Sequence, residues 1–172
     1  MYKKDRPIQL YLKKRDRFFV SIGWISNGHW AFDLRWANIK TRIPGLKKAL
    51  DDKWMELNYG YGGWEKHIEL DLDPKRPFPN ISLAIPSQDY LIKGNYPLST
   101  NEVLQEDGTC TLLRGKKKLC DISAQNWKLL TNPALFFRVP DQDRAPVCIY
   151  FPAERPFLKE YLIGVVMPLR NK

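Results

Sequence analysis

The fold is decided by the stretch Leu135-Phe-Phe-Arg-Val-Pro-Asp-Gln-Asp-Arg-Ala-Pro-Val-Cys-Ile-Tyr-Phe151. Two short apolar runs flank a polar loop bounded by prolines, a pattern that predicts a β-hairpin. Upstream, residues 121–132 read as a helix with Asp121 or Ser123 as N-cap and Asn132-Pro133 as its stop. Downstream, Tyr161-Leu-Ile-Gly-Val-Val-Met-Pro-Leu-Arg170 predicts a buried last strand, with Pro168 marking its edge. Helix, hairpin and closing strand together indicate one helix packed on an antiparallel sheet.

The order of the predicted elements and the amino-acid sequence over residues 118–170 resemble the C-terminal half of a bacterial DNA sliding clamp domain. In that family a short helix leads into a hairpin, and the chain ends in a strand close to Val165-Val-Met-Pro-Leu-Arg170. Two shorter similarities lie upstream. Leu91-Ile-Lys-Gly-Asn-Tyr-Pro97 resembles the Gly-aromatic-Pro turn that closes a clamp domain. Asn27-Gly-His-Trp30 resembles the family's Asp-Gly-His-Arg turn and departs from it at Asn27 and Trp30.

This resemblance implies a non-enzymatic, DNA-associated accessory protein. Clamp domains join edge to edge into a ring of six around the duplex, line the pore with helices and tether a polymerase. A chain of 172 residues supplies one such domain, so a full ring would need several copies. The implied partners are DNA, contacted through its backbone, a replication or repair protein, and further copies of this chain.

Composition agrees with a folded, basic protein. Apolar residues make up 44% of the chain, and the net charge is +9, which favours a polyanionic partner such as nucleic acid. Residues 1–17 hold seven Lys or Arg and two Asp, a net +5. The alternation of Ile8, Leu10 and Leu12 predicts a half-buried strand there, so its charges either guard a sheet edge or contact a polyanion.

Two further aromatic segments are predicted as strands. Phe18–Trp24 is the first, followed by a turn at Ser26–His29. In residues 30–36 the alternation places Trp30, Phe32 and Leu34 on one face and Asp33 and Arg35 on the other. Core packing is the expected role of these rings, and stacking on single-stranded nucleic acid is the alternative.

Residues 43–57 are predicted to form the first helix. Pro44 suits an opening turn, and Leu46, Leu50, Trp54 and Leu57 recur at three- and four-residue steps. Lysines 47, 48 and 53 lie on this segment, where the clamp resemblance implies phosphate contact. An ordinary solvated helix face is the competing interpretation.

A second basic group follows the strand Cys110–Arg114. Gly115-Lys-Lys-Lys118 predicts a basic hairpin tip, which either adds solubility or contacts a polyanion. With Lys128 of the second predicted helix, this group completes the candidate nucleic-acid contacts: Lys47, Lys48, Lys53, Arg114, Lys116, Lys117, Lys118 and Lys128.

The sequence gives little indication of a metal site, a disulfide framework or a catalytic site. The three cysteines, Cys110, Cys120 and Cys148, contain no Cys-x-x-Cys pair, so neither a zinc site nor a disulfide framework is indicated. The acidic alternation over residues 65–73 is more typical of a solvated strand face than of a metal site. His29 and His67 lack any recognisable partner for base catalysis. We expect no enzyme, no cofactor, no membrane span and a cytoplasmic location.

The sequence therefore predicts an α+β fold dominated by antiparallel strands, in a single clamp-like domain of residues 1–172 with two short helices at 43–57 and 121–132. The proline-rich segment 74–79 is the one candidate internal boundary. Two functions compete with the clamp-like one. The first is an aromatic-rich β protein that binds single-stranded nucleic acid. The second is an interaction protein of a phage or mobile element with no nucleic-acid role.

Overall fold

The computed structural model describes residues 6–13, 16–21, 23–39, 53–59, 65–69, 85, 99, 101–130, 136–139, 146–151 and 162–169. For residues 21, 53–59, 65–69 and 136–138 it describes the backbone alone. The chain divides into two compact units, Met1–Ile81 and Ser82–Lys172. The proline-rich segment 74–79 lies outside the described residues, and a single domain stays a prediction.

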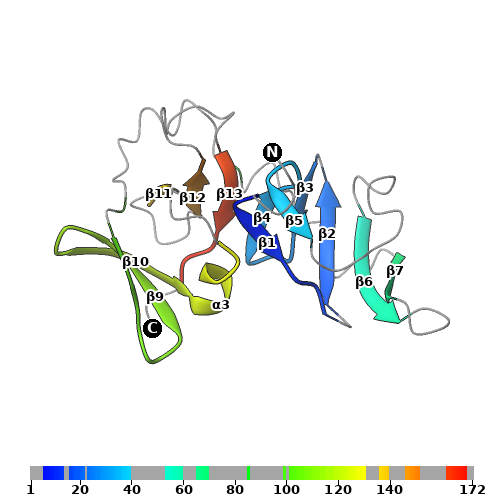
Figure 1. Ribbon diagram of the computed structural model, residues 1–172, viewed down its shortest axis with the longest axis horizontal. Helices are drawn as coiled ribbons and strands as arrows, with labels where there is room; N and C mark the ends of the chain where they lie inside the picture. Colours follow the sequence, from blue (N-terminus) through cyan, green and yellow to red (C-terminus); the bar gives the residue numbers. More distant parts are fainter. Residues whose placement is uncertain are drawn as a thin grey trace. The chain divides into compact units, whose positions relative to one another are not determined.

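The first unit is built from short strands, drawn from blue through cyan to turquoise-green in Figure 1. Their bounds are β1 (Ile8–Leu10), β2 (Arg17–Ser21), β3 (Trp24–Ser26), β4 (Trp30–Asp33), β5 (Ala37–Ile39), β6 (Lys53–Tyr59) and β7 (Glu65–Glu69). The order β4-β3-β2-β6-β7 is antiparallel throughout, while β1 pairs with β5 in parallel. The predicted alternation in β1 is confirmed, since Ile8, Leu10 and Leu12 are buried and Tyr11 is exposed.

Residues Phe18–Trp24 form two strands and not the single strand that was predicted. Gly23 has a positive φ of 78°, a backbone region that glycine enters without steric cost. The chain therefore reverses after β2, and β3 pairs back onto it with Val20 opposite Ile25. The predicted turn after Ser26 is present: the Asn27 side chain accepts bonds from the backbone N–H of His29 and Trp30.

The aromatic residues of β4 belong to the core, as predicted. Trp30 and Phe32 are buried, and their rings stack with centroids 4.8 Å apart. The face of this segment that carries Asp33 is covered as well, because Asp33 is buried, with 3% of its surface exposed. Arg35 neutralises its charge from the following turn, which the alternation of apolar residues does not reveal.

The predicted helix at 43–57 is wrong over residues 53–57, which belong to β6. β6 is held on both sides, by β2 and by β7, and this long-range pairing overrides the helical spacing of the apolar residues. Residues 43–52, including Lys47 and Lys48, lie outside the described residues.

The second unit holds two groups of three antiparallel strands and one described helix, α3. The bounds are β8 (Asn101–Leu104), β9 (Thr109–Arg114), β10 (Lys117–Ser123), α3 (Ala124–Trp127), β11 (Phe136–Arg138), β12 (Val147–Tyr150) and β13 (Leu162–Val166). The orders are β10-β9-β8 and β11-β12-β13. The predicted hairpin of β11 with β12 is confirmed, and so is the last strand, which is buried at all five positions of β13.

The predicted helix at 121–132 is much shorter in the structure. Residues 121–123 extend β10, and of residues 121–130 only 124–127 are helical, while residues 131 and 132 lie outside the described part of the chain. Ser123 is the N-cap, one of the two residues predicted, and its hydroxyl accepts a bond from the Gln125 N–H. The backbone stays extended through Asp121 and Ile122 because both pair with β9. β8 was not predicted, since its four residues are too few to show a period.

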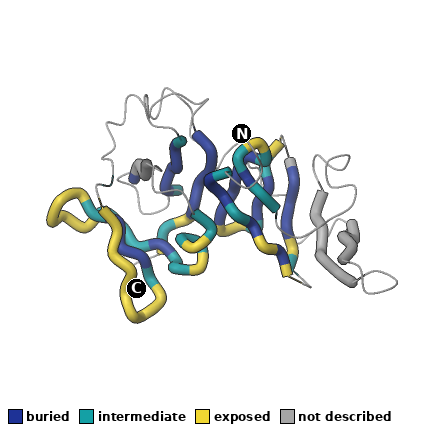
Figure 2. Tube along the Cα trace, viewed as in Figure 1, coloured by how far each residue is buried: buried dark blue, intermediate teal, exposed yellow. Residues whose placement is uncertain are grey.

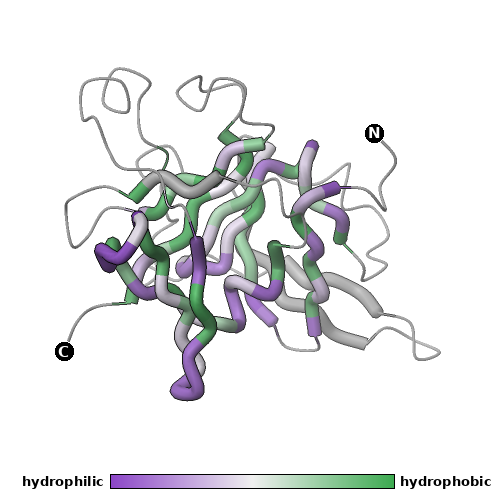
Figure 3. The backbone as a smooth tube through the Cα atoms, turned by 60° about the vertical axis from the view of Figure 1, so that its left-hand side comes forward, coloured by the Kyte–Doolittle hydropathy of each residue, from purple (hydrophilic) through white to green (hydrophobic). Residues whose placement is uncertain are grey.

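In the described segments, Figure 3 shows hydrophobic residues mainly along the strands and hydrophilic residues at several of the strand ends and tight turns. In the second unit the core residues are Cys110, Leu112, Ile122, Val139, Val147, Cys148, Ile149, Tyr150, Leu162, Ile163, Val165 and Val166. α3 packs against β9 and β10. The three-stranded group β8–β10 thus has one anchored region and two exposed loops.

Candidate nucleic-acid interface

The β9–β10 hairpin gathers four basic residues at one turn. Arg114 and Lys117 are the last paired residues of the two strands, and Gly115 and Lys116 form the two-residue loop between them. Gly115 has a φ of 60°, which suits the first position of a tight hairpin turn. Lys118 follows on β10. We define Arg114, Lys116, Lys117 and Lys118 as the basic tip.

All four residues of the basic tip are exposed, and Figure 2 shows the loop as a yellow segment at one end of the hairpin. The described residues supply no ion-pair partner for Arg114, Lys116 or Lys117. Lys118 differs, because its Nζ lies 2.5 Å from Oδ2 of Asp121. The tip therefore presents three positive charges that no described residue neutralises and a fourth that is partly neutralised.

Asp121 connects the basic tip to the body of the hairpin. Its Oδ1 accepts a bond of 2.7 Å from the Thr111 hydroxyl on β9, and its Oδ2 receives the Lys118 ammonium. Burial raises the pKa of this carboxyl, but the bonds from Lys118 and Thr111 outweigh burial, so the pKa lies below its ordinary value. Asp121 stays ionised at neutral pH and holds Lys118 against the strand.

The opposite part of the hairpin is fixed by apolar packing and by the chain end. Cys110, Leu112 and Ile122 are fully buried, and Leu169 N–H donates a 2.8 Å bond to the Asp121 carbonyl on the outer edge of β10. The tip is consequently carried on a strand pair whose other part is anchored, and its basic residues lie apart from the core.

The structure brings together four of the eight predicted contact residues. Lys128 is exposed, but it follows α3 at the other end of β10. Five residues of β10 (119–123), roughly 17 Å of strand, and then α3 lie between the tip and Lys128. Lys53 lies in β6 of the other unit, where only the backbone is described, and Lys47 and Lys48 lie outside the described residues.

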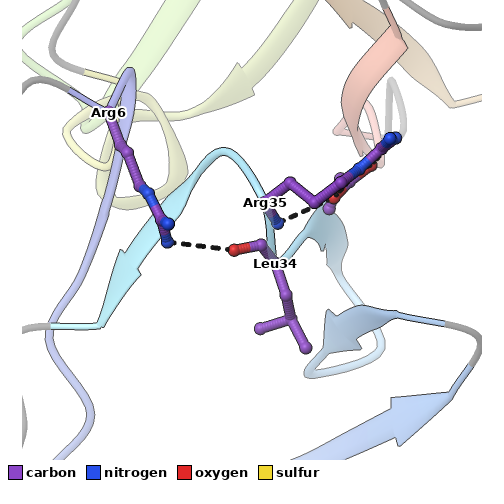
Figure 4. A network of polar contacts seen from close by, with 4 residues as sticks. Arg6, Leu34 and Arg35 are labelled. Atoms are coloured by element: carbon purple, nitrogen blue, oxygen red, sulfur yellow. Dashed lines mark hydrogen bonds and ion pairs between the residues drawn. The ribbon is translucent and has the colours of Figure 1, made fainter. Parts of the chain in front are cut away.

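Two arginines of the first unit are engaged within the fold (Figure 4). Arg6 Nη1 donates to the carbonyls of Leu34 and Ala37, at 3.2 and 2.9 Å, and so closes the turn between β4 and β5. Arg35 forms a two-pronged contact with the Asp33 carboxylate, at 3.0 Å through Nε and 2.6 Å through Nη2. Part of the basic charge of this unit therefore stabilises a turn.

Thiol chemistry is disfavoured at two of the cysteines. Burial raises the pKa of Cys110 to about 11 and that of Cys120 to about 12, with nearby carboxylates adding to the shift. Cys148 is fully buried. Within the described part of the chain, no group of three His, Cys, Asp or Glu residues is placed to hold a metal ion.

Comparison of the chain with protein-family models, curated proteins and solved structures finds no match. None of the helical residues that the structure describes form a segment with the length and hydropathy of a membrane span.

Proposed function

We propose that this chain is a non-enzymatic nucleic-acid-associated accessory protein that binds the sugar–phosphate backbone through its basic tip. One observation carries the proposal: Arg114, Lys116 and Lys117 are exposed together at a hairpin turn, and the described residues neutralise none of them. Clustered, unpaired cations on a rigid support attract phosphates and release their counterions. Such contacts position a protein on nucleic acid without reading its sequence.

The clamp-like role is the more specific form of this proposal. It would place copies of the chain around a duplex, where they would tether a replication or repair protein. The order of β11, β12 and β13 favours it, because the resemblance implies a hairpin followed by a closing strand. The strand at residues 53–57 weighs against a lysine-bearing helix there, so the proposed phosphate contact is the basic tip.

Single-strand binding by aromatic stacking is less favoured. A stacking platform needs exposed rings beside basic residues. Of the six rings in residues 18–36, Phe18, Phe19, Trp30 and Phe32 are buried and Trp24 and Trp36 are half-buried, while Tyr11 outside this segment is exposed. A pure interaction protein is the remaining candidate, and it predicts no binding to any oligonucleotide at physiological salt.

The test compares two double variants that lose the same charge. Lys116→Gln/Lys117→Gln alters the basic tip, and Lys13→Gln/Arg17→Gln alters exposed residues of the first unit. Binding to fluorescent duplexes of two unrelated sequences is followed by anisotropy over a range of salt concentrations. Each lost phosphate contact lowers the slope of log K against log salt by roughly 0.9, so the tip variant should lose about 2 and the control variant little.

Equal affinity for the two duplexes is expected, because backbone contacts carry no sequence information. Equal losses in both variants would contradict the assignment to the basic tip. Binding to single strands but not to duplexes, with quenched tryptophan fluorescence, would favour the stacking alternative. No binding to duplex or single strand at physiological salt would support the interaction protein.

A further inference from the structure

β8 forms an exposed edge of the three-stranded group β10-β9-β8. All four of its residues are exposed, including two apolar ones, Val103 at 41% and Leu104 at 58%. The opposite edge, β10, receives a backbone bond from Leu169. Among the described strands none pairs with the outer side of β8, and exposed apolar residues on such an edge are a ready site for another strand to pair.

The ladder between β8 and β9 determines which backbone groups of β8 point outward. Gln105 N–H donates to the Thr109 carbonyl at 2.9 Å, so this pair is a hydrogen-bonded one. Bonded and non-bonded pairs alternate along an antiparallel ladder. Val103, opposite Thr111, and Asn101, opposite Leu113, therefore bond inward to β9. The N–H and C=O groups of Glu102 and Leu104 point to the open edge.

The two ends of this edge lie beside residues of opposite charge. The turn that follows β8 carries Glu106 and Asp107, both exposed. The start of β8 lies beside the end of β9, since Asn101 pairs with Leu113 and the next residue of β9 is Arg114. The edge thus has Arg114 of β9 beside one end and the acidic turn at the other, with Glu102 and two apolar residues between them.

We propose that β8 pairs antiparallel with β8 of a second copy of this chain, about a two-fold axis at Val103. In that register Glu102 of each copy faces Leu104 of the other, and these are the residues whose backbone groups point outward. Gln105 faces Asn101, which brings the acidic turn of one copy level with Arg114 of the other. Arg114 and Glu106 are then two strands apart, roughly 10 Å between backbones, within reach of their two side chains.

A second copy fits this edge better than an unrelated strand. The same register pairs the outward backbone groups of Glu102 and Leu104 and also brings Glu106 of each copy near Arg114 of the other. The pairing is isologous, so two copies close the assembly and leave no further β8 edge. The interface is a strand of four residues, small beside the area of a stable dimer. We therefore expect a weak dimer that forms at high protein concentration.

Disulfide trapping tests the register. Val103 lies on the axis in a non-bonded pair, with backbones about 4.5 Å apart, a separation that a disulfide spans. Val103→Cys should give a covalent dimer under mild oxidation. Gln105→Cys is the matched control: it is also exposed, but its two copies lie four residues apart along the strand, roughly 14 Å. It should form no covalent dimer under the same oxidation, and neither should the unaltered chain with its three native cysteines.

Two reversible variants test the same contact by sedimentation without any covalent bond. Leu104→Pro removes an outward donor and leaves the inward bonds of β8, so it should abolish the dimer while the circular dichroism stays unchanged. Glu106→Arg and Arg114→Glu should each weaken the dimer several-fold, and the double variant should restore it.

These measurements contain no nucleic acid. Their outcome therefore tests the dimer independently of the proposed binding to the sugar–phosphate backbone. A chain that stays monomeric at high concentration, with no trapping through Val103→Cys, would overturn it. Equal trapping through Val103→Cys and Gln105→Cys would overturn the proposed register.

Discussion

Asp33 shows how a residue of the following turn can compensate a buried charge. Its Oδ1 accepts the Arg35 N–H at 2.8 Å, and both carboxylate oxygens receive the Arg35 guanidinium. Asp33 is buried, whereas the Arg35 side chain is 74% exposed. The guanidinium thus covers the carboxylate and remains hydrated itself. The bond to Asp33 also raises the pKa of Arg35, so this cation is permanent.

We expect Asp33→Ala to lower the free energy of unfolding by about 2 kcal/mol, because hydrogen bonds to a charged group contribute about 1.5–3 kcal/mol. Asp33→Asn is the control, since an amide oxygen still accepts the Arg35 N–H, and its loss should be smaller. Urea unfolding followed by tryptophan fluorescence measures both. A loss below about 0.5 kcal/mol for Asp33→Ala, the level of an ordinary surface substitution, would mean that the turn does not depend on this carboxylate.

The stability of the β9–β10 hairpin depends on the ionised carboxylate of Asp121. Its folded pKa lies below the ordinary value of 3.8. A carboxyl with a depressed folded pKa stabilises the protein above its unfolded pKa, and that stabilisation is lost as the pH falls through the folded pKa.

Asp121→Asn should therefore be less stable than the unaltered chain at pH 6, and the difference should close as the pH falls below about 4. Thermal unfolding across this pH range measures the difference. Thr111→Val should reduce the same pH dependence, because the hydroxyl bond is one cause of the depressed pKa. A gap between Asp121→Asn and the unaltered chain that is constant with pH would show that ionisation of Asp121 does not stabilise the hairpin.

For some elements the sequence pattern was sufficient to predict the structure. The β11–β12 hairpin and β13 follow from apolar runs separated by a polar loop, and the basic tip follows from a glycine between a strand and three lysines. The helical spacing at residues 53–57 was overridden by pairing with β2 and β7. The burial of Asp33 depends on a contact formed by its own turn, which an alternation of apolar residues does not encode.

For the whole molecule, the net charge of +9 indicated a polyanionic partner, but it did not indicate where the contact lies. Eight basic residues were predicted to contact nucleic acid, and the structure groups four of them at one tip. Arg6 illustrates the missing information, because its charge closes a turn through two backbone carbonyls. The edge at β8 was missed entirely, since a strand of four residues gives no readable period.

The most direct test of the account asks which lysines duplex DNA covers. Lysine acetylation is measured residue by residue by mass spectrometry, with and without a saturating duplex. We predict that Lys116 and Lys117 are protected several-fold, while Lys13, an exposed lysine of the first unit, reacts at an unchanged rate. Unchanged acetylation of Lys116 and Lys117 under saturating duplex, or equal protection of Lys13, would contradict backbone binding through the basic tip.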